Sequence, residues 1–108
     1  MGTSTIGSRN LGKSADLSEG VVNPYYVSDL KRRVSVTRVA GKLYAFDDLC
    51  THEGCQLSAG KLVGTILMCP CHGSQFDITT GDVVRGPAKR PLTTYGAGDE
   101  AGEIEISL

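Results

Sequence analysis

The sequence predicts an all-β protein, and two observations lead to that class. Apolar residues alternate with polar ones at residues 34–39 and again at residues 103–108, which is the period of a strand with one buried face. No stretch of the chain has the apolar period of about 3.6 residues that marks an amphipathic helix. We therefore expect stacked antiparallel sheets, with two loops rich in cysteine and histidine at one tip.

The N-terminal residues 1–20 differ in composition from the rest of the chain. They are rich in serine, glycine and threonine and show no apolar periodicity, so we expect a flexible segment. The folded domain is then predicted to span residues 21–108, which is enough for one compact core. Residues 21–27 are β-prone, but Pro24 restricts them to an edge strand or a lead-in, because proline has no N–H to donate to a neighbouring strand.

The segments that follow alternate between β-prone runs and turns that contain glycine. Residues 34–46 predict a hairpin, and the basic run at 31–33 predicts a solvated turn, with docking of an acidic partner as the alternative. The later elements that we expect are two strand pairs, a strand, a loose acidic turn and a final strand: residues 62–63 with 66–68, 76–78 with 82–84, 92–95, 96–102 and 104–108.

Charge and hydropathy narrow the classes of protein. The 108 residues carry 11 basic and 12 acidic side chains, a net charge of −1, whereas a nucleic-acid-binding domain is usually basic. No apolar run approaches the ~20 residues of a membrane-spanning helix. The first residues contain no apolar stretch of the secretory kind, so we expect a cytoplasmic protein without a membrane span.

All four cysteines and both histidines lie in two short boxes. Residues 50–55 read CTHEGC, and residues 69–74 read CPCHGS. The pattern is C-x-H, then sixteen residues, then C-x-x-H, with one additional cysteine in each box. This concentration of soft ligands predicts a metal centre.

The order of ligands within the boxes separates two kinds of centre. Zinc sites with two cysteines and two histidines usually pair like with like, as C-x₂₋₄-C followed by H-x₃₋₅-H. Here each box mixes one cysteine with one histidine. A mixed pair in each box suits a binuclear centre in which one iron takes both thiolates and the other takes both imidazoles, as in a Rieske [2Fe–2S] centre. A structural zinc module is the alternative.

Both boxes resemble those of the Rieske iron–sulfur proteins, in particular the Rieske-type ferredoxins. The similarity covers residues 34–95. Downstream of the two boxes it includes FD at 76–77, TG at 80–81 and GPA at 86–88. The resemblance implies one Rieske-type [2Fe–2S] cluster. Its implied ligands are two cysteines on one iron and two histidines on the other: Cys50, Cys69, His52 and His72.

The resemblance also implies roles for residues around the ligands. In the Rieske proteins of cytochrome bc complexes, residues at the positions of Cys55 and Cys71 form a disulfide; two unpaired thiols, which a reducing cytosol favours, are the alternative. The Ser74 hydroxyl is expected to donate to the cluster sulfurs, which raises the redox potential. Pro87 belongs to a segment that resembles the proline loop covering the cluster, although an ordinary turn is the other interpretation. Phe76 replaces a tyrosine of high-potential members, so we expect an intermediate potential.

The implied function is a Rieske-type ferredoxin, an electron-transfer protein and not an enzyme. It would be a monomer that carries one electron between a flavoprotein reductase and a terminal oxygenase. No residue set for catalysis is visible, and a site with four protein ligands has no open coordination position. The alternative is a Rieske subunit or excised Rieske domain of a larger redox enzyme, such as a cytochrome bc complex or an arsenite oxidase-like enzyme. The additional cysteines and Ser74 favour that alternative, whereas the short chain and the F-D-x-x-T-G run favour the carrier.

Overall fold

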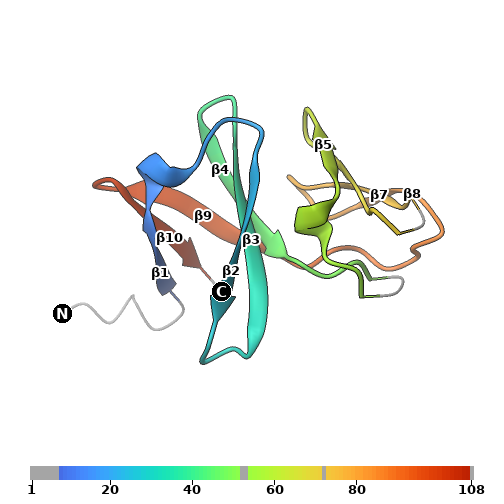
Figure 1. The fold of residues 1–108 in the computed structure, drawn as a ribbon, viewed down its shortest axis with the longest axis horizontal. Helices are drawn as coiled ribbons and strands as arrows, with labels where there is room; N and C mark the ends of the chain where they lie inside the picture. Colours follow the sequence, from blue (N-terminus) through green and yellow to red (C-terminus); the bar gives the residue numbers. More distant parts are fainter. Residues whose placement is uncertain (1–7, 52–53, 72, 108) are drawn as a thin grey trace.

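The chain folds into two antiparallel sheets, as the computed structural model shows for residues 8–51, 54–71 and 73–107 (Figure 1). Within these ranges the elements are strands and two short 3₁₀ helices, so the all-β prediction is confirmed. The six-stranded sheet has the order β1-β10-β9-β4-β3-β2. Its strands are β1 (Ser8–Lys13), β2 (Val22–Val27), β3 (Arg32–Val39), β4 (Lys42–Asp47), β9 (Thr94–Glu100) and β10 (Glu103–Ser107). None of the helices in the described part of the chain is long and apolar enough to cross a membrane.

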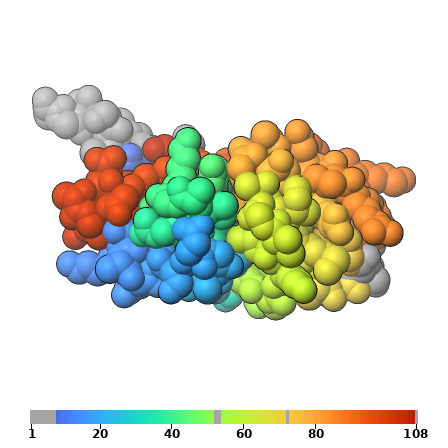
Figure 2. Space-filling model, turned by 90° about the horizontal axis from the view of Figure 1, so that it is seen from above, coloured from blue at the N-terminus to red at the C-terminus, as the bar shows by residue number. Residues whose placement is uncertain are grey.

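The four-stranded sheet is an excursion from the larger one. The chain leaves the large sheet at the end of β4 and returns at β9, and these two strands pair with each other. The segment between β4 and β9 contains η3 (Leu57–Ala59), β5 (Lys61–Val63), β6 (Ile66–Met68), β7 (Gln75–Asp77) and β8 (Val83–Arg85). The other 3₁₀ helix, η2 (Ser14–Asp16), connects β1 to β2. We call residues 49–93 the small lobe, and its described residues gather at one end of a molecule that measures 45 × 26 × 19 Å (Figure 2).

Each lobe has its own hydrophobic core. The core of the large sheet is built from strand residues whose side chains are almost completely buried: Val34, Val36, Ala45, Ile104 and Ile106. The core of the small lobe contains Leu57, Leu67, Phe76 and Ile78, together with Phe46 from β4. Cys50 and Cys69 belong to this second core, so both cysteines are anchored in packed structure.

The local patterns predicted most strands correctly. The hairpin expected at residues 34–46 is β3 with β4, and the two later strand pairs are β5 with β6 and β7 with β8. The final alternating segment is β10, in which Ile104 and Ile106 are buried and Leu108 lies outside the described residues. Strand β2, which contains Pro24, lies at the sheet edge, as the missing N–H requires.

The N-terminal segment differs from the expectation of a flexible segment over residues 1–20. Residues 8–13 form β1, which pairs with β10, and Leu17 is 4% exposed in the large core. Arg38 donates from Nη2 to the Ser14 carbonyl oxygen at 2.9 Å, which holds the connection to β2. Backbone pairing with a neighbour needs no apolar alternation, so the sequence pattern contains no sign of β1. Residues 1–7 lie outside the described part.

The acidic segment at residues 96–102 also differs from its prediction as a loose turn. Strand β9 extends to Glu100, and its residues from Gly96 onward pair with β10, with Gly96 opposite Ser107 and Gly98 opposite Glu105. The turn itself is only Ala101 and Gly102, which both have positive φ. Gly96, Ala97 and Gly98 supply almost no side-chain pattern, so only pairing with the neighbouring strand reveals them as a strand.

Candidate metal centre

The first box folds into a closed loop directly after β4. The Cys50 N–H donates to the Cys55 carbonyl oxygen at 2.8 Å, and the Gly54 N–H donates to the Cys50 carbonyl oxygen at 2.8 Å. Gly54 has φ of +75°, a left-handed conformation that a residue with a side chain adopts only under strain. The glycine is therefore what allows the loop to close on its first residue.

The second box repeats this construction between β6 and β7. The Cys69 N–H donates to the Ser74 carbonyl oxygen at 2.7 Å, and the Gly73 N–H donates to the Cys69 carbonyl oxygen at 3.2 Å. Gly73 has φ of +78°. In both loops the first residue is a cysteine that bonds to the residue five positions later and accepts from a glycine four positions later. The sequence boxes are thus two equivalent turns that each present a cysteine at the same place.

The cysteines have two different fates. Cys55 and Cys71 form a disulfide with a Cα–Cα distance of 6.4 Å, and it joins the same two residues that the resemblance implied. Cys50 and Cys69 stay outside the disulfide and are each 3% exposed. The Cys69 sulfur lies within 4.8 Å of both disulfide sulfurs, but these three sulfurs are no thiolate site while Cys55 and Cys71 are bonded to each other.

The donor set suits an iron–sulfur cluster. A thiolate that is buried without a compensating charge is unfavourable, whereas a metal deprotonates a coordinating thiol outright. Cys50 and Cys69 are buried side chains at equivalent positions of two linked loops. His52 and His72 lie in these loops by sequence, and their placement is outside the described residues. The described part of the site therefore fits two thiolate ligands of one centre.

Asp48 holds the base of the first loop. Its side chain is completely buried, and Oδ1 accepts the Ser58 N–H at 2.6 Å. Oδ2 accepts the Ser58 hydroxyl at 2.8 Å and an N–H of Arg33 at 3.3 Å. The Leu57 N–H bonds the Asp48 carbonyl oxygen at 3.2 Å, so the chain entering the loop is tied to the chain leaving it. Asp48 therefore fixes the spacing between the two ends of the first loop.

Replacing Asp48 with alanine should lower the free energy of unfolding by about 2–3 kcal/mol. The change leaves the Ser58 N–H and hydroxyl without an acceptor and removes the partner of Arg33, which is partly exposed and therefore partly compensated by water. Urea unfolding followed by circular dichroism measures the change, and visible absorbance measures the rate of cluster loss. Asp29→Asn, which alters an exposed ion pair, is the control. Equal unfolding midpoints for the two variants would contradict this role of Asp48.

The neighbouring Asp47 fixes the same strand end to the large sheet. Its carboxylate accepts the Tyr95 hydroxyl of β9 and lies 3.5 Å from Nη1 of Arg32. Burial, followed by the hydrogen bond to Asp47, raises the pKa of Tyr95 above its usual value. The phenol of Tyr95 therefore remains a hydrogen-bond donor at neutral pH. The end of β4, from which the first loop begins, is held by contacts with both neighbouring strands.

A segment after β8, residues 86–91, contacts both loops; we call it the strap. The Ala88 N–H donates to the buried Ser74 hydroxyl oxygen of the second loop at 2.9 Å. On the first loop, the Thr51 hydroxyl donates to the Arg90 carbonyl oxygen at 2.7 Å, and Arg90 donates from Nη2 to the Thr51 carbonyl oxygen at 3.2 Å. Pro87 is exposed and follows a cis peptide bond. The sequence suggested a proline loop in this segment. It did not predict the contact with the first loop, because Thr51 and Arg90 are 39 residues apart in the sequence.

The contact between Ala88 and Ser74 leaves the serine able to act as a donor. A hydroxyl has one hydrogen and two lone pairs, and the Ala88 N–H occupies only a lone pair. Ser74 is completely buried beside Cys69, whose loop it closes. Its role as a donor to cluster sulfur remains a prediction that this geometry permits.

The disulfide predicts a specific pattern of thiol reactivity. In denaturant without reductant, an alkylating reagent should modify Cys50 and Cys69 once iron is removed, and should leave Cys55 and Cys71 unmodified. Adding reductant should expose all four, because only then do the last two have thiols. Mass spectrometry of the digested protein reads out each position. Modification of Cys55 or Cys71 before reduction would show that the two loops are not covalently joined.

Three kinds of comparison relate this chain to known proteins. The protein-family model described as the Rieske [2Fe-2S] domain matches residues 9–96. The ferredoxin component of the naphthalene 1,2-dioxygenase system of Pseudomonas putida is 33% identical over 94 residues, which is 87% of this chain and 88% of that protein. The ferredoxin subunit of the 3-phenylpropionate/cinnamic acid dioxygenase of Escherichia coli K12 is 37% identical over 76 residues, 69% of this chain and 72% of that protein.

Solved structures show the same relationship. The ferredoxin of Sphingomonas yanoikuyae B1 superposes with a TM-score of 0.87 at 33% identity, covering 94% of this chain and 98% of that one. A chain in the complex of reduced oxygenase and oxidized ferredoxin of carbazole 1,9a-dioxygenase has a TM-score of 0.87 at 28% identity, covering 94% and 93%. The structural similarity thus extends over almost the whole length of both chains in these two superpositions.

Proposed function

Because the chain belongs to the Rieske [2Fe-2S] domain family, we propose that it carries single electrons from a flavoprotein reductase to a terminal oxygenase. The observation that carries this proposal is its similarity, over 87% of its length, to a ferredoxin component of a dioxygenase system. The fold that the chain shares with solved structures of dioxygenase-type ferredoxins, with TM-scores of 0.87, supports the same conclusion. The cofactor is one [2Fe–2S] cluster.

We propose four ligands for this cluster. Cys50 and Cys69 would bind one iron, supported by their burial and their equivalent positions in the two loops. His52 and His72 would bind the other, supported by the mixed boxes of the sequence. When bound, the cluster accepts one electron, and its neutral imidazole ligands place the potential at roughly −150 to +300 mV, against about −400 mV for plant-type ferredoxins.

The protein residues around the ligands have positioning roles. Asp48 ties the two ends of the first loop together, and the Cys55–Cys71 disulfide joins the two loops to each other. The strap adds a second connection through Ser74 and Thr51. Loops held in this way change little on reduction, so electron transfer requires little reorganisation of the protein.

The partners follow from the proposed role. The oxygenase is the proposed acceptor, and the complex of an oxygenase with a ferredoxin in the carbazole system supports it. The flavoprotein reductase is the proposed donor. The chain would serve as a component of an oxidoreductase system without catalysing a reaction alone. A monomeric state and a cytoplasmic location stay predictions.

A second candidate is a Rieske subunit or excised domain of a larger redox enzyme. The Cys55–Cys71 disulfide favours it, because the Rieske proteins of cytochrome bc complexes resemble this chain in their cysteine pair. The two candidates differ in redox potential, which a dye-mediated titration of the purified protein measures. A potential near the upper end of the Rieske range would favour the subunit.

Reconstitution tests the carrier function directly. Iron and acid-labile sulfide analysis should give about two of each per chain. Purified protein should then support NADH-dependent reduction of an oxygenase only when a flavoprotein reductase is also present. A cluster-loaded chain that accepts no electron from the reductase and reduces no oxygenase would reject the proposal, and zinc in place of iron would identify the structural module instead.

A further inference from the structure

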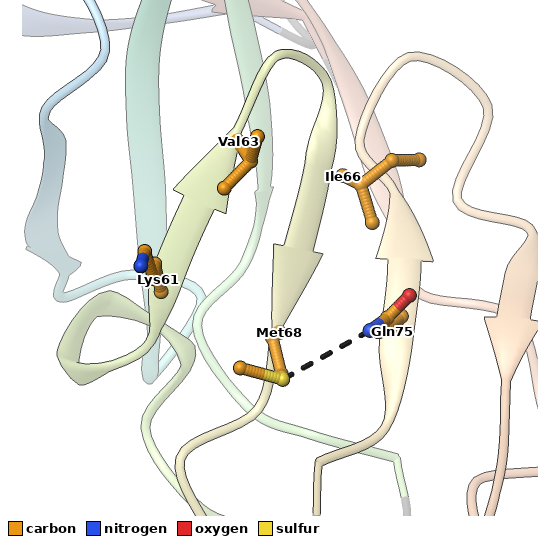
Figure 3. A pocket seen from close by; sticks show the side chains of 5 residues that line it. All are labelled: Lys61, Val63, Ile66, Met68 and Gln75. Atoms are coloured by element: carbon orange, nitrogen blue, oxygen red, sulfur yellow. Dashed lines mark hydrogen bonds between the residues drawn. The ribbon is translucent and has the colours of Figure 1, made fainter.

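Four basic side chains of the small lobe lie at the end where the two loops emerge. Lys61 pairs with Met68, Met68 with Gln75, and Gln75 with Arg85, so one row crosses all four strands of the small sheet. This row is the last one before the loops, because β6 leads directly into Cys69. Figure 3 shows Lys61, Met68 and Gln75 together at this end of the strands. The two ends of this row, on the outer face of the sheet, are therefore the cations Lys61 and Arg85.

The strap supplies the other two cations. Lys89 and Arg90 lie in it, and both are exposed, as are Lys61 and Arg85. The strap contacts both cluster loops, so its charges also lie beside them. We call Lys61, Arg85, Lys89 and Arg90 the cationic rim.

No carboxylate of the described residues forms an ion pair with the cationic rim. The ion pairs that the described residues form all join arginines and aspartates on the large-sheet side: Arg9–Asp29, Arg32–Asp47 and Arg33–Asp48. Asp77 lies in the row of Val63 and Ile66, farther from the loops, and its carboxylate accepts the Thr79 N–H at 3.0 Å. Glu53, the one carboxylate in the two boxes, lies outside the described residues.

The two lobes consequently differ in charge. Residues 49–93 contain four cations and three carboxylates, whereas the rest of the chain contains seven cations and nine carboxylates. The net charge of −1 therefore hides a molecule whose cluster end is the more positive one. A charged partner that approaches the cluster end is attracted more by these nearby cations than it is repelled by the carboxylates of the other lobe, because Coulomb interactions weaken with distance.

An apolar groove adjoins the cationic rim. It is a pocket of about 300 Å³ on the outer face of the small sheet, lined by Lys61, Val63, Ile66, Met68 and Gln75 (Figure 3). Val63 is 64% exposed and Met68 is 37% exposed. Apolar surface surrounded by charged side chains is the usual composition of a protein-binding site, in which a buried anchor supplies affinity and the charges supply steering.

We propose that the cationic rim and the adjoining groove form the docking surface for an acidic patch on the terminal oxygenase. Carboxylates of the oxygenase face Lys61, Arg85 and Lys89, and an apolar side chain enters the groove beside Met68. The choice of the oxygenase rests on the proposed function and on the oxygenase–ferredoxin complex of the carbazole system. The charge of the surface comes from this chain alone.

Two triple variants with the same change in net charge test the field at the cluster end. Lys61→Gln, Arg85→Gln and Lys89→Gln neutralise the rim, while Arg90 is kept because it bonds to Thr51. The control is Lys13→Gln, Lys31→Gln and Lys42→Gln, which removes three exposed lysines from the large-sheet side.

The probe is hexacyanoferrate(III), which takes one electron from each reduced protein molecule and becomes hexacyanoferrate(II). At low ionic strength, the rim variant should react about tenfold more slowly than wild type, and the control should stay within about twofold. The wild-type rate should fall as salt is added, although the net charge alone predicts that it rises. Equal slowing in both triple variants, or a wild-type rate that rises with salt, would overturn the proposal.

Binding to the purified oxygenase tests the partner. The rim variant should raise the Kd for the oxygenase about tenfold relative to the control triple variant at low salt. Val63→Ser should also weaken binding while leaving the hexacyanoferrate rate unchanged, and Val21→Ser, exposed on the other lobe, should change neither. If only the reaction with the reductase responds to the rim variant, the partner assignment is wrong. If wild type reduces no oxygenase but accepts electrons from dithionite normally, the proposed function has failed instead.

Discussion

Replacing His52 or His72 with alanine is expected to abolish the Rieske-type electron paramagnetic resonance signal of the reduced protein. Each substitution removes one of the two imidazoles proposed for one iron. The remaining ligands, Cys50 and Cys69, are both proposed for the other iron, so neither can replace the lost imidazole. Iron content and visible absorbance should fall with the signal.

The control for this pair is Gln56→Ala, which changes an exposed side chain next to the first box. This variant should keep the signal and the iron content of wild type. Circular dichroism of all three variants shows whether the sheets are retained, so that loss of a ligand is distinguished from loss of the fold. An unchanged signal in both histidine variants would refute the proposed ligands.

The second large effect is expected from Gly60→Ala, although Gly60 is not a ligand. A Cβ at this position would lie 2.0 Å from the Met68 carbonyl oxygen and 3.1 Å from the Leu57 carbonyl oxygen. Both are backbone atoms, so no side chain can rotate away. Met68 directly precedes Cys69, and the added methyl group would therefore push the second loop away from the first. We expect destabilisation by about 3 kcal/mol together with poor cluster incorporation.

Gly64→Ala provides the matched comparison. Gly64 has φ of +62°, but no atom lies within 4 Å of the position that its Cβ would take. Only backbone strain opposes this substitution, and we expect it to lower the free energy of unfolding by about 1 kcal/mol. Urea unfolding and iron analysis of the two variants separate the effects. If Gly60→Ala unfolds at the same urea concentration as Gly64→Ala and binds full iron, the close approach at Gly60 does not hold the loops in place.

The kind of metal centre could be predicted from the sequence, because it depends on residues that lie close together in the chain. Two boxes that contain every cysteine and histidine point to one centre, and the mixture of ligands in each box distinguishes iron–sulfur from zinc. The alternation at residues 34–39 and 103–108 likewise identifies β3 and β10, because a strand with one buried face alternates over neighbouring residues.

Other features needed the folded chain, because they depend on residues that are far apart in sequence. Strand β1 exists through backbone pairing with β10, so its side chains follow no pattern. The contacts of Asp48 with Ser58 and of Thr51 with Arg90 span 10 and 39 residues. Sequence composition indicated a net charge of −1, whereas the strand register brought Lys61 and Arg85, and the strap brought Lys89 and Arg90, beside the loops. The periodicity of a segment shows which of its faces is buried. It does not show which other segments pack against that face, because the packing of the whole chain decides this.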